Sequence, residues 1–243
     1  MIISKSFKNS LLFCFVILNS VYACSQSIDS AWVIENQLPA FNIPKNTTLP
    51  ILKFTDVEGK EKSLADFKGK VLYVKLWSTF CAPCIGDFPY QEQLMKRIKR
   101  LNLDTSIVFI NINIENTSAD WKKALQKYNP VGINLHYGDS LIFNKWDFDA
   151  IPFFVIIDQN GNLIGKDTPG TSDDSIDWLL YCSAKNYDLT TSVWRSFTQS
   201  KLMEQHHSSK AFTDKEFAAW FEKIFPSLIE FNEWRISHEK KSH

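Results

Sequence analysis

The chain has no excess of either charge, because its 243 residues include 27 Lys or Arg and 27 Asp or Glu. A balanced net charge gives no indication of a polyanionic partner, so we expect no nucleic-acid binding. Internal repeats and low-complexity tracts are also missing from the sequence. With 44% hydrophobic residues, the chain is long enough for one α/β domain with additions.

Cysteine is scarce, with five residues in the whole chain, and the spacings typical of zinc sites are absent. There is neither a second Cys-x-x-Cys motif nor a His-x-x-x-His pair, and His136, His206 and His207 do not stand at ligand spacing. We therefore predict no metal site. Cys182 lies among apolar residues at helical spacing and is predicted to be a buried thiol without a role.

Two cysteines stand between a predicted strand and a predicted helix, in the motif Cys81-Ala82-Pro83-Cys84. The preceding residues, 71–77, are apolar, β-branched and aromatic, which is typical of a buried strand. The following residues, 84–101, place apolar side chains at helical spacing. A helix N-terminus favours a thiolate, because it offers free N–H groups and a positive dipole end. We predict that Cys81 is the nucleophile and that Cys84 attacks the mixed disulfide that forms.

Two other roles for the cysteine pair stay open at this point. The two thiols can be half of a zinc site, or they can form an inert structural bridge. Such a short loop gains little stability from cross-linking, which argues against the bridge. We favour redox exchange, with the Cys81–Cys84 disulfide itself as the redox group and no bound cofactor.

The residues around the motif, Trp77-Ser78-Thr79-Phe80-Cys81-Ala82-Pro83-Cys84, resemble the active-site signature of the thioredoxin superfamily. The resemblance is strongest to the exported, membrane-tethered thiol–disulfide oxidoreductases of the TlpA/ResA-like group. Other stretches resemble that group in the same order, over about residues 48–186: Asp56-Val57-Glu58-Gly59-Lys60, Ser63-Leu64, Phe67-Lys68-Gly69-Lys70, Phe88-Pro89 and residues 150–161. The resemblance implies a thioredoxin-like α/β fold, in which helices flank a central mixed sheet.

The same resemblance assigns residues to a substrate groove beside the dithiol. It implies that the Ile151–Pro152 bond is cis and packs against the cysteines, although the sequence alone gives no reason to expect a cis bond. Pro152 is therefore counted with the catalytic residues, and Ile151 would present its backbone to an extended substrate strand, a form of β-augmentation. Phe80 stands where a tryptophan often precedes the first cysteine. The remaining groove residues implied are Trp77, Ala82 and Pro83.

Two charged residues near the motif each allow two interpretations. Asp87 stands where the TlpA/ResA-like group usually carries a glutamate, and it is either a first-turn helix carboxylate or the proton acceptor for Cys84. Lys75 lies on the predicted strand, where cytoplasmic thioredoxins have a buried aspartate. Its amine either reaches solvent or pairs with Asp87 and favours the Cys81 thiolate. We count both residues among the candidate catalytic groups.

The first residues of the chain have the pattern of a secretory signal. Lys5 and Lys8 precede an apolar run at residues 11–18 that is too short to span a membrane. Val21-Tyr22-Ala23 before Cys24 resembles a bacterial lipobox, and it also fits an ordinary signal-peptidase site that would release a soluble protein. We favour a lipidated Cys24, and so expect a protein of the periplasm or cell envelope whose membrane contact is the lipid anchor.

The expected direction of electron flow also comes from the resemblance. The dipeptide Ala82-Pro83 resembles the reducing members of the superfamily, whereas strongly oxidising members carry a histidine there. An exported reductase meets oxidising conditions, so it needs an electron donor, which we expect to be a membrane partner. Its substrates would be protein thiols and disulfides. The alternative is a non-catalytic lipoprotein that binds a partner through its helical tail.

These observations divide the chain into four segments: a signal peptide at 1–23, a tether at 24–47, a thioredoxin-like domain at 48–186 and a helical extension at 187–243. In the extension, Thr213-Asp214-Lys215-Glu216 is a capping-box pattern that opens a helix. Pro226 is predicted to end this helix, and a second helix is expected after it. The large apolar side chains here fit either a cap packed on the domain or a docking surface for a partner.

Overall fold

The computed structural model describes residues 34–115, 117–139 and 141–239 of the chain. The predicted signal peptide, the candidate lipidation site Cys24 and the first part of the predicted tether lie outside these ranges. The chain separates into two compact units, Met1–Pro39 and Ala40–His243, and the strands described below belong to the second. Among the described residues, no helix combines the length and the apolar character that a membrane crossing needs.

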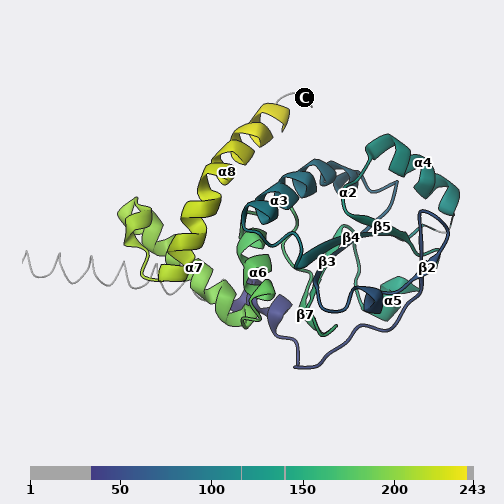
Figure 1. Ribbon diagram of the computed structural model, residues 1–243, viewed down its shortest axis with the longest axis horizontal. Helices are drawn as coiled ribbons and strands as arrows, with labels where there is room; N and C mark the ends of the chain where they lie inside the picture. Colours follow the sequence, from purple (N-terminus) through teal and green to yellow (C-terminus); the bar gives the residue numbers. More distant parts are fainter. Residues whose placement is uncertain (1–33, 116, 140, 240–243) are drawn as a thin grey trace, which may run out of the picture. The chain divides into compact units, whose positions relative to one another are not determined.

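A mixed sheet forms the centre of the second unit (Figure 1). Its seven described strands stand in the order β2-β1-β5-β4-β3-β6-β7, with these bounds: β1 Phe54–Asp56, β2 Glu61–Lys62, β3 Val71–Trp77, β4 Ile107–Asn113, β5 Ile133–His136, β6 Phe153–Ile157 and β7 Leu163–Lys166. Strand β3 pairs in parallel with β4 and antiparallel with β6. The predicted mixed sheet is therefore confirmed.

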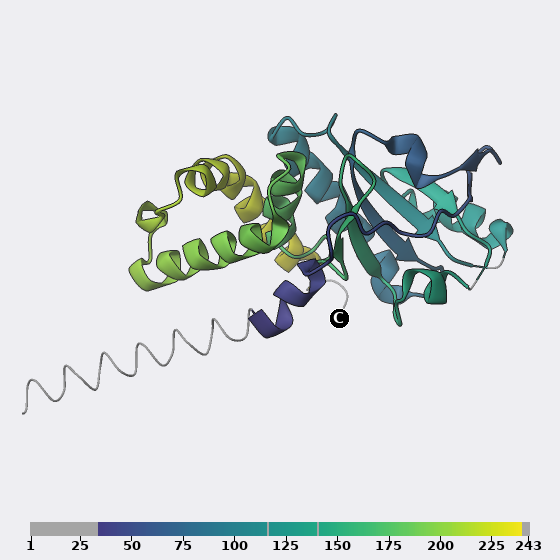
Figure 2. The same cartoon turned by 90° about the horizontal axis from the view of Figure 1, so that it is seen from below.

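Helices lie on both faces of this sheet (Figures 1 and 2). The α-helices are α2 Ala82–Gly86, α3 Phe88–Arg100, α4 Ser118–Tyr128, α5 Ile142–Trp146, α6 Ser175–Ala184, α7 Leu189–His206 and α8 Lys215–Glu239. Short 3-10 helices are η1 Leu38–Phe41, η2 Leu64–Phe67 and η3 Ser209–Ala211. The predicted strand at 71–77 is β3, whereas the predicted helix at 84–101 is divided into α2 and α3.

The division between α2 and α3 falls at Asp87. Proline has no N–H, so Pro89 cannot donate the bond to the Ile85 carbonyl that a continuous helix requires. Asp87 instead becomes the N-cap residue of α3, and its carbonyl oxygen accepts the Gln91 N–H at 3.0 Å. The kink that the resemblance implies for Phe88-Pro89 is therefore present.

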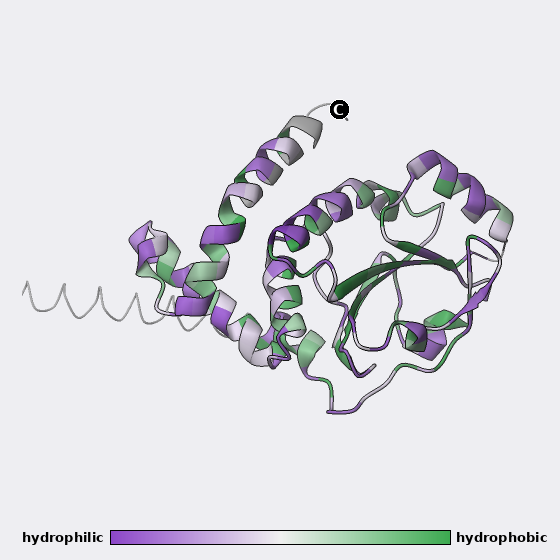
Figure 3. Ribbon diagram, in the orientation of Figure 1, coloured by the Kyte–Doolittle hydropathy of each residue, from purple (hydrophilic) through white to green (hydrophobic). Residues whose placement is uncertain are grey.

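Strand β3 is buried along its whole length, and its side chains alternate between two cores. Val71 and Tyr73 belong to the core that contains the apolar side chains of α3 and α6, whereas Leu72 and Val74 belong to the core that contains those of α5. Figure 3 shows the strands as an apolar centre between helices that carry polar residues. A strand that is covered on both faces usually has a nearly continuous apolar sequence, and within β3 the charged residue Lys75 departs from this pattern.

A buried ion pair connects α3 with α6. Arg97 Nε lies 2.9 Å from Asp177 Oδ1, and Arg97 Nη2 lies 3.0 Å from Asp177 Oδ2. Burial raises the pKa of Asp177 to about 6, and the Arg97 guanidinium opposes this shift. Because a bidentate pair fixes the relative orientation of its partners, this contact holds α3 in place beside α6.

The C-terminal extension packs on the domain through the first half of α8. Phe217, Trp220 and Ile224 are buried in the same core as the apolar side chains of α6. Trp178 of α6 makes edge-on ring contacts with Phe217 and Trp220, with centroids 4.9 Å and 5.1 Å apart. The interpretation of the extension as a packed cap is therefore confirmed for these residues.

Three features of the outer segments differ from the sequence-based expectations. The predicted break at Pro226 is wrong, because this residue lies inside α8; the helix continues because Ile224 and Ser227, on either side of it, are both buried against the domain. Helix α7 lies within the predicted helical extension, but it was not predicted as a separate helix with these bounds. Phe41 falls in the predicted tether, yet its ring is buried in the core, so the chain is anchored before residue 48.

We expect Trp220→Ala to lower the free energy of unfolding by about 3–5 kcal/mol, because it empties an aromatic position in the core shared by α6 and α8. Phe225→Ala, on the same helix with 42% of the side chain exposed, is the matched control and should cost about 1 kcal/mol or less. Urea unfolding followed by circular dichroism measures both variants. If the two substitutions lower the free energy of unfolding equally, the buried face of α8 contributes no more to the stability of the domain than its exposed face.

Candidate active site

The two motif cysteines form a disulfide at the start of α2, directly after the loop that follows β3. Cys81 is the N-cap residue of α2, and the Cys84 N–H donates to the Cys81 sulfur at 3.2 Å. The side chain of Cys81 is 7% exposed and that of Cys84 is fully buried. Both cysteines are therefore buried, Cys81 slightly less than Cys84, and the Cys81 sulfur receives a backbone N–H, as the position at a helix N-terminus predicts.

The Ile151–Pro152 bond is cis, as the resemblance implies. The loop containing it lies directly before β6, and the Ile151 carbonyl oxygen is 3.6 Å from the Cys81 sulfur. Pro83 and Pro152 line a groove of about 500 Å³ beside the dithiol. The other residues lining this groove are Gly86, Asp87, Tyr90, Phe154, Gly170 and Ser172. The cis proline thus lines a groove together with Pro83, which stands between the two cysteines.

Lys75 forms a buried ion pair with Asp87 beneath the dithiol. Lys75 Nζ lies 2.8 Å from Asp87 Oδ2 and donates to the Cys84 carbonyl oxygen at 2.9 Å. Its side chain is 2% exposed, so the interpretation of Lys75 as a solvated amine is wrong and the pairing with Asp87 is confirmed. Burial lowers the pKa of Lys75, and the Asp87 carboxylate opposes that shift. The ammonium also lies 4.0 Å from the centroid of the Phe88 ring, a cation–π contact.

The Asp87 carboxylate has a second buried partner that the sequence did not identify. Thr171 Oγ1 donates to Asp87 Oδ1, and Thr171 is fully buried in the segment between β7 and α6. No motif or spacing relates these two positions, because they are 84 residues apart in the chain. Asp87 also lines the groove, so the residue that pairs with the buried amine belongs to the surface that a substrate would contact.

The remaining predicted groove residues do not all reach the surface. Trp77 is fully buried and packs edge-on against Phe88, with centroids 5.0 Å apart. The expectation that Trp77 lines the groove is wrong, because its ring fills the space under the dithiol loop instead. Phe80 is 79% exposed, and Ala82 and Pro83 are also exposed at the start of α2. These three side chains remain available to a substrate.

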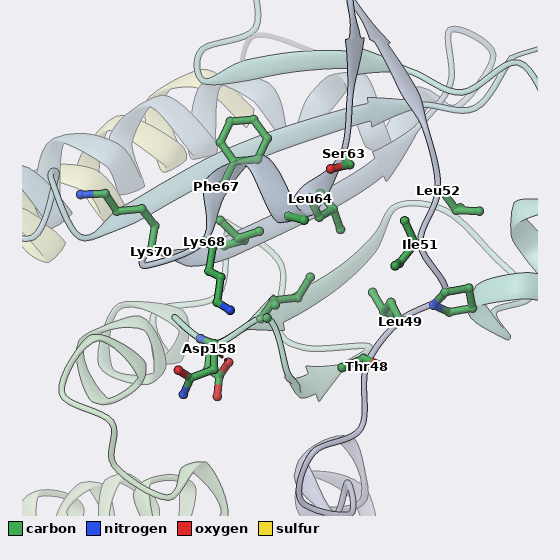
Figure 4. Close-up of a pocket in the computed structure, with 16 residues that line it drawn as sticks. Thr48, Leu49, Ile51, Leu52, Ser63, Leu64, Phe67, Lys68, Lys70 and Asp158 are labelled. Atoms are coloured by element: carbon green, nitrogen blue, oxygen red, sulfur yellow. Dashed lines mark hydrogen bonds between the residues drawn. The ribbon is translucent and has the colours of Figure 1, made fainter.

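A second cavity of about 300 Å³ lies at the far end of β6 from the cis proline, beside Ile157 and Asp158 (Figure 4). Apolar side chains such as Leu49, Leu64 and Phe67 surround it. Its lining includes neither cysteine nor histidine, so it offers no group for redox chemistry. Within the described part of the chain, no group of three or more His, Cys, Asp or Glu side chains is placed to hold a metal ion.

Known proteins resemble this chain over the same region. The family described as Redoxin matches residues 35–177, which include the dithiol, Asp87 and the cis proline. Two curated relatives are named thiol-disulfide oxidoreductase ResA. The one from Bacillus thuringiensis subsp. konkukian is 30% identical over 118 residues, 47% of this chain and 64% of that protein. The one from Bacillus subtilis is 26% identical over 136 residues, 56% of this chain and 73% of that protein.

A solved structure agrees with these matches. The crystal structure of a candidate thiol-disulfide oxidoreductase from Bacteroides vulgatus is similar with a TM-score of 0.52 and 32% identity, over 57% of this chain and 95% of that one. The chain covers slightly less than two thirds of the Bacillus thuringiensis protein, and α7 and α8 lie beyond the matched family region. Because the family match covers more than half of its residues, the chain belongs to the Redoxin family, as a TlpA/ResA-like member of the thioredoxin superfamily.

Proposed function

We propose that the chain is an exported thiol–disulfide oxidoreductase that reduces disulfides in protein substrates through Cys81 and Cys84. The observation that carries the proposal is the setting of the Cys81 sulfur. Cys81 is the less buried residue of the pair, and its sulfur receives the Cys84 N–H at 3.2 Å and lies 3.6 Å from the carbonyl oxygen of Ile151, the residue before the cis proline. The names of the curated relatives support the same chemistry.

In the reductive direction, the Cys81 thiolate attacks one sulfur of a substrate disulfide. A bond forms between Cys81 Sγ and that sulfur, and the other substrate sulfur leaves as a thiolate that takes a proton. Cys84 then loses its proton and attacks Cys81 Sγ, which releases the second substrate thiol. The pair of electrons passes to the substrate, and the enzyme ends with the Cys81–Cys84 disulfide.

The loop that contains the cis proline would hold the substrate during this exchange. The Ile151 carbonyl oxygen lies 3.6 Å from the Cys81 sulfur, so a substrate backbone bound along the loop would have its cysteine next to Cys81. Phe80, Ala82 and Pro83, the neighbours of Cys81 in the sequence, present exposed apolar surface. Binding by backbone hydrogen bonds suits an enzyme that acts on many protein substrates.

Asp87 is proposed to accept the proton that Cys84 must lose before it can attack. Lys75 Nζ bridges the two residues, since it contacts the Cys84 carbonyl oxygen at 2.9 Å and Asp87 Oδ2 at 2.8 Å. Its buried positive charge lies beside both groups and attracts the negative charge that passes between the Cys84 thiolate and the Asp87 carboxylate. Lys75 is therefore a positioning residue, and Asp87 is the proton acceptor.

The compartment and the electron donor belong to the same proposal. The signal pattern of residues 1–23 and the position of Cys24 support export with a lipid anchor. In an oxidising compartment the Cys81–Cys84 disulfide must be reduced again after each cycle, so a thiol donor is required. A membrane protein that passes electrons across the bilayer would supply them.

We expect the Cys81–Cys84 pair to behave as a reversible couple with a potential of roughly −270 mV, close to that of thioredoxin. Equilibration of the mature chain in graded thiol–disulfide buffers, followed by alkylation, measures it. Cys182→Ser is the control and should leave the potential unchanged, because burial raises the pKa of the Cys182 thiol to about 12 and keeps it unreactive. A value near −120 mV would make the protein an oxidant, and the absence of a reversible couple would favour the non-catalytic binding protein.

We expect Asp87→Asn to slow the release of a trapped mixed disulfide by about a hundredfold, because Cys84 loses its proton acceptor. Alkylation of Cys81 should stay nearly normal, since the Cys84 N–H still faces the Cys81 sulfur. Asp149→Asn, which changes an exposed carboxylate on the segment before Pro152, should alter neither rate. If Asp87→Asn slows both steps equally, Asp87 is not the proton acceptor.

A further inference from the structure

The groove beside the dithiol extends along the first turn of α3 to Tyr90. Pro83 and Pro152 line the part next to the cysteines, and Tyr90 lines the part that lies on α3. A volume of about 500 Å³ is larger than one thiol-bearing side chain requires. The groove can therefore contact substrate residues beyond the reacting cysteine.

The second half of α8 is attached to α3 by contacts that follow one another along both helices. The Arg100 guanidinium, at the end of α3, donates to Ser227 Oγ and, at 3.2 Å, to Glu230 Oε2. Trp234 then packs edge-on against Tyr90 near the start of α3, with centroids 5.6 Å apart and ring planes at 87°. Helix α8 thus runs antiparallel to α3 and towards the dithiol end of the domain (Figure 1).

The residues of α8 that make these contacts share one face of the helix. Positions 227, 230 and 234 are separated by three and four residues, the spacing that aligns side chains on one side. Ile229 and Ile236, at 43% and 50% exposure, mark other sides of the same helix and serve as internal references. The face turned to α3 is therefore the one that carries Trp234 to the end of the groove.

We infer that the C-terminal helix sets the protein-substrate preference of the enzyme, through the contact of Trp234 with Tyr90. Tyr90 forms the outer end of the groove and receives a large apolar side chain of the polypeptide that flanks the substrate cysteine. Trp234 is the positioning residue that fixes the Tyr90 ring from behind. The occupant is an extended protein segment, because the groove is lined by Pro83, which stands between the two cysteines, and by Pro152 of the cis-proline loop, on which the substrate backbone is proposed to bind. This inference rests on the proposed reductase activity.

Aromatic rings suit this role because they supply large contact areas and lose few rotatable bonds on binding. A few such side chains carry most of the affinity in a protein interface. A small disulfide that reaches only Cys81 and the cis-proline loop gains nothing from Tyr90. Loss of the aromatic contact should therefore weaken the binding of protein substrates and leave the reaction with a small disulfide unchanged.

The experiment compares one protein disulfide with one small disulfide. The reduced mature chain is mixed with increasing concentrations of insulin or of cystamine, and oxidation of Cys81–Cys84 is followed by acid quench and alkylation. Trp234→Ala is expected to raise the half-saturating insulin concentration about tenfold, with an unchanged limiting rate and an unchanged rate with cystamine. Trp234→Phe should keep most of the wild-type behaviour. Ile236→Ala, an exposed position on the same helix, should match the wild type on both substrates.

Two results would overturn the inference. If the Trp234→Ala variant reacts with insulin as the wild type does, the aromatic contact plays no part in substrate binding. Equal losses with insulin and cystamine, or a shifted potential of the Cys81–Cys84 couple, would show that Trp234 only supports the fold. A wild-type chain that reduces neither disulfide would refute the proposed reductase activity itself, which distinguishes the two failures.

Discussion

A buried ammonium group organises the centre of this protein. Lys75 lies in the middle of a strand that is covered on both faces, where an unpaired charge would be costly. The fold satisfies it with the Asp87 carboxylate, the Cys84 carbonyl oxygen and the face of the Phe88 ring. These partners all lie at the junction of α2 and α3, so the requirement to pair one amine also determines where the dithiol stands. The structural core and the redox site therefore depend on the same contact.

The two ends of helix α3 connect this site to the rest of the molecule. At the dithiol end, the break before Pro89 falls at Asp87, which pairs with the buried lysine and lines the groove. At the other end, Arg97 is fixed to Asp177 of α6 and Arg100 contacts α8. The C-terminal extension is consequently joined to the domain through both its core and α3. Helix α8 is placed to influence which proteins reach the dithiol.

Sequence reasoning succeeded where the determinants are local and failed where distant packing overrides them. The apolar run of β3 and the prolines around the motif predicted a strand, a kinked helix and the dithiol between them. Pro226 predicted a helix break that does not occur, because burial on both sides of it compensates for one lost backbone bond. The bounds of helix α7, within the predicted helical extension, were not predicted because polar side chains lie on its buried face. Gln199 is buried, and its side-chain oxygen accepts the backbone N–H groups of Thr213 and Asp214.

The sequence by itself determined the redox motif, its position at a helix N-terminus, the membership of Lys75 in the central strand and the family resemblance, because each depends on residues that are close together in the chain. Only the tertiary structure decided which side chains meet across long separations. Thr171 reaches Asp87 from 84 residues away, and Trp234 reaches Tyr90 from the far end of the chain. It also decided that Trp77 is covered while Phe80 is exposed. No local pattern carries that information, since burial depends on which elements the whole fold brings against each strand and loop.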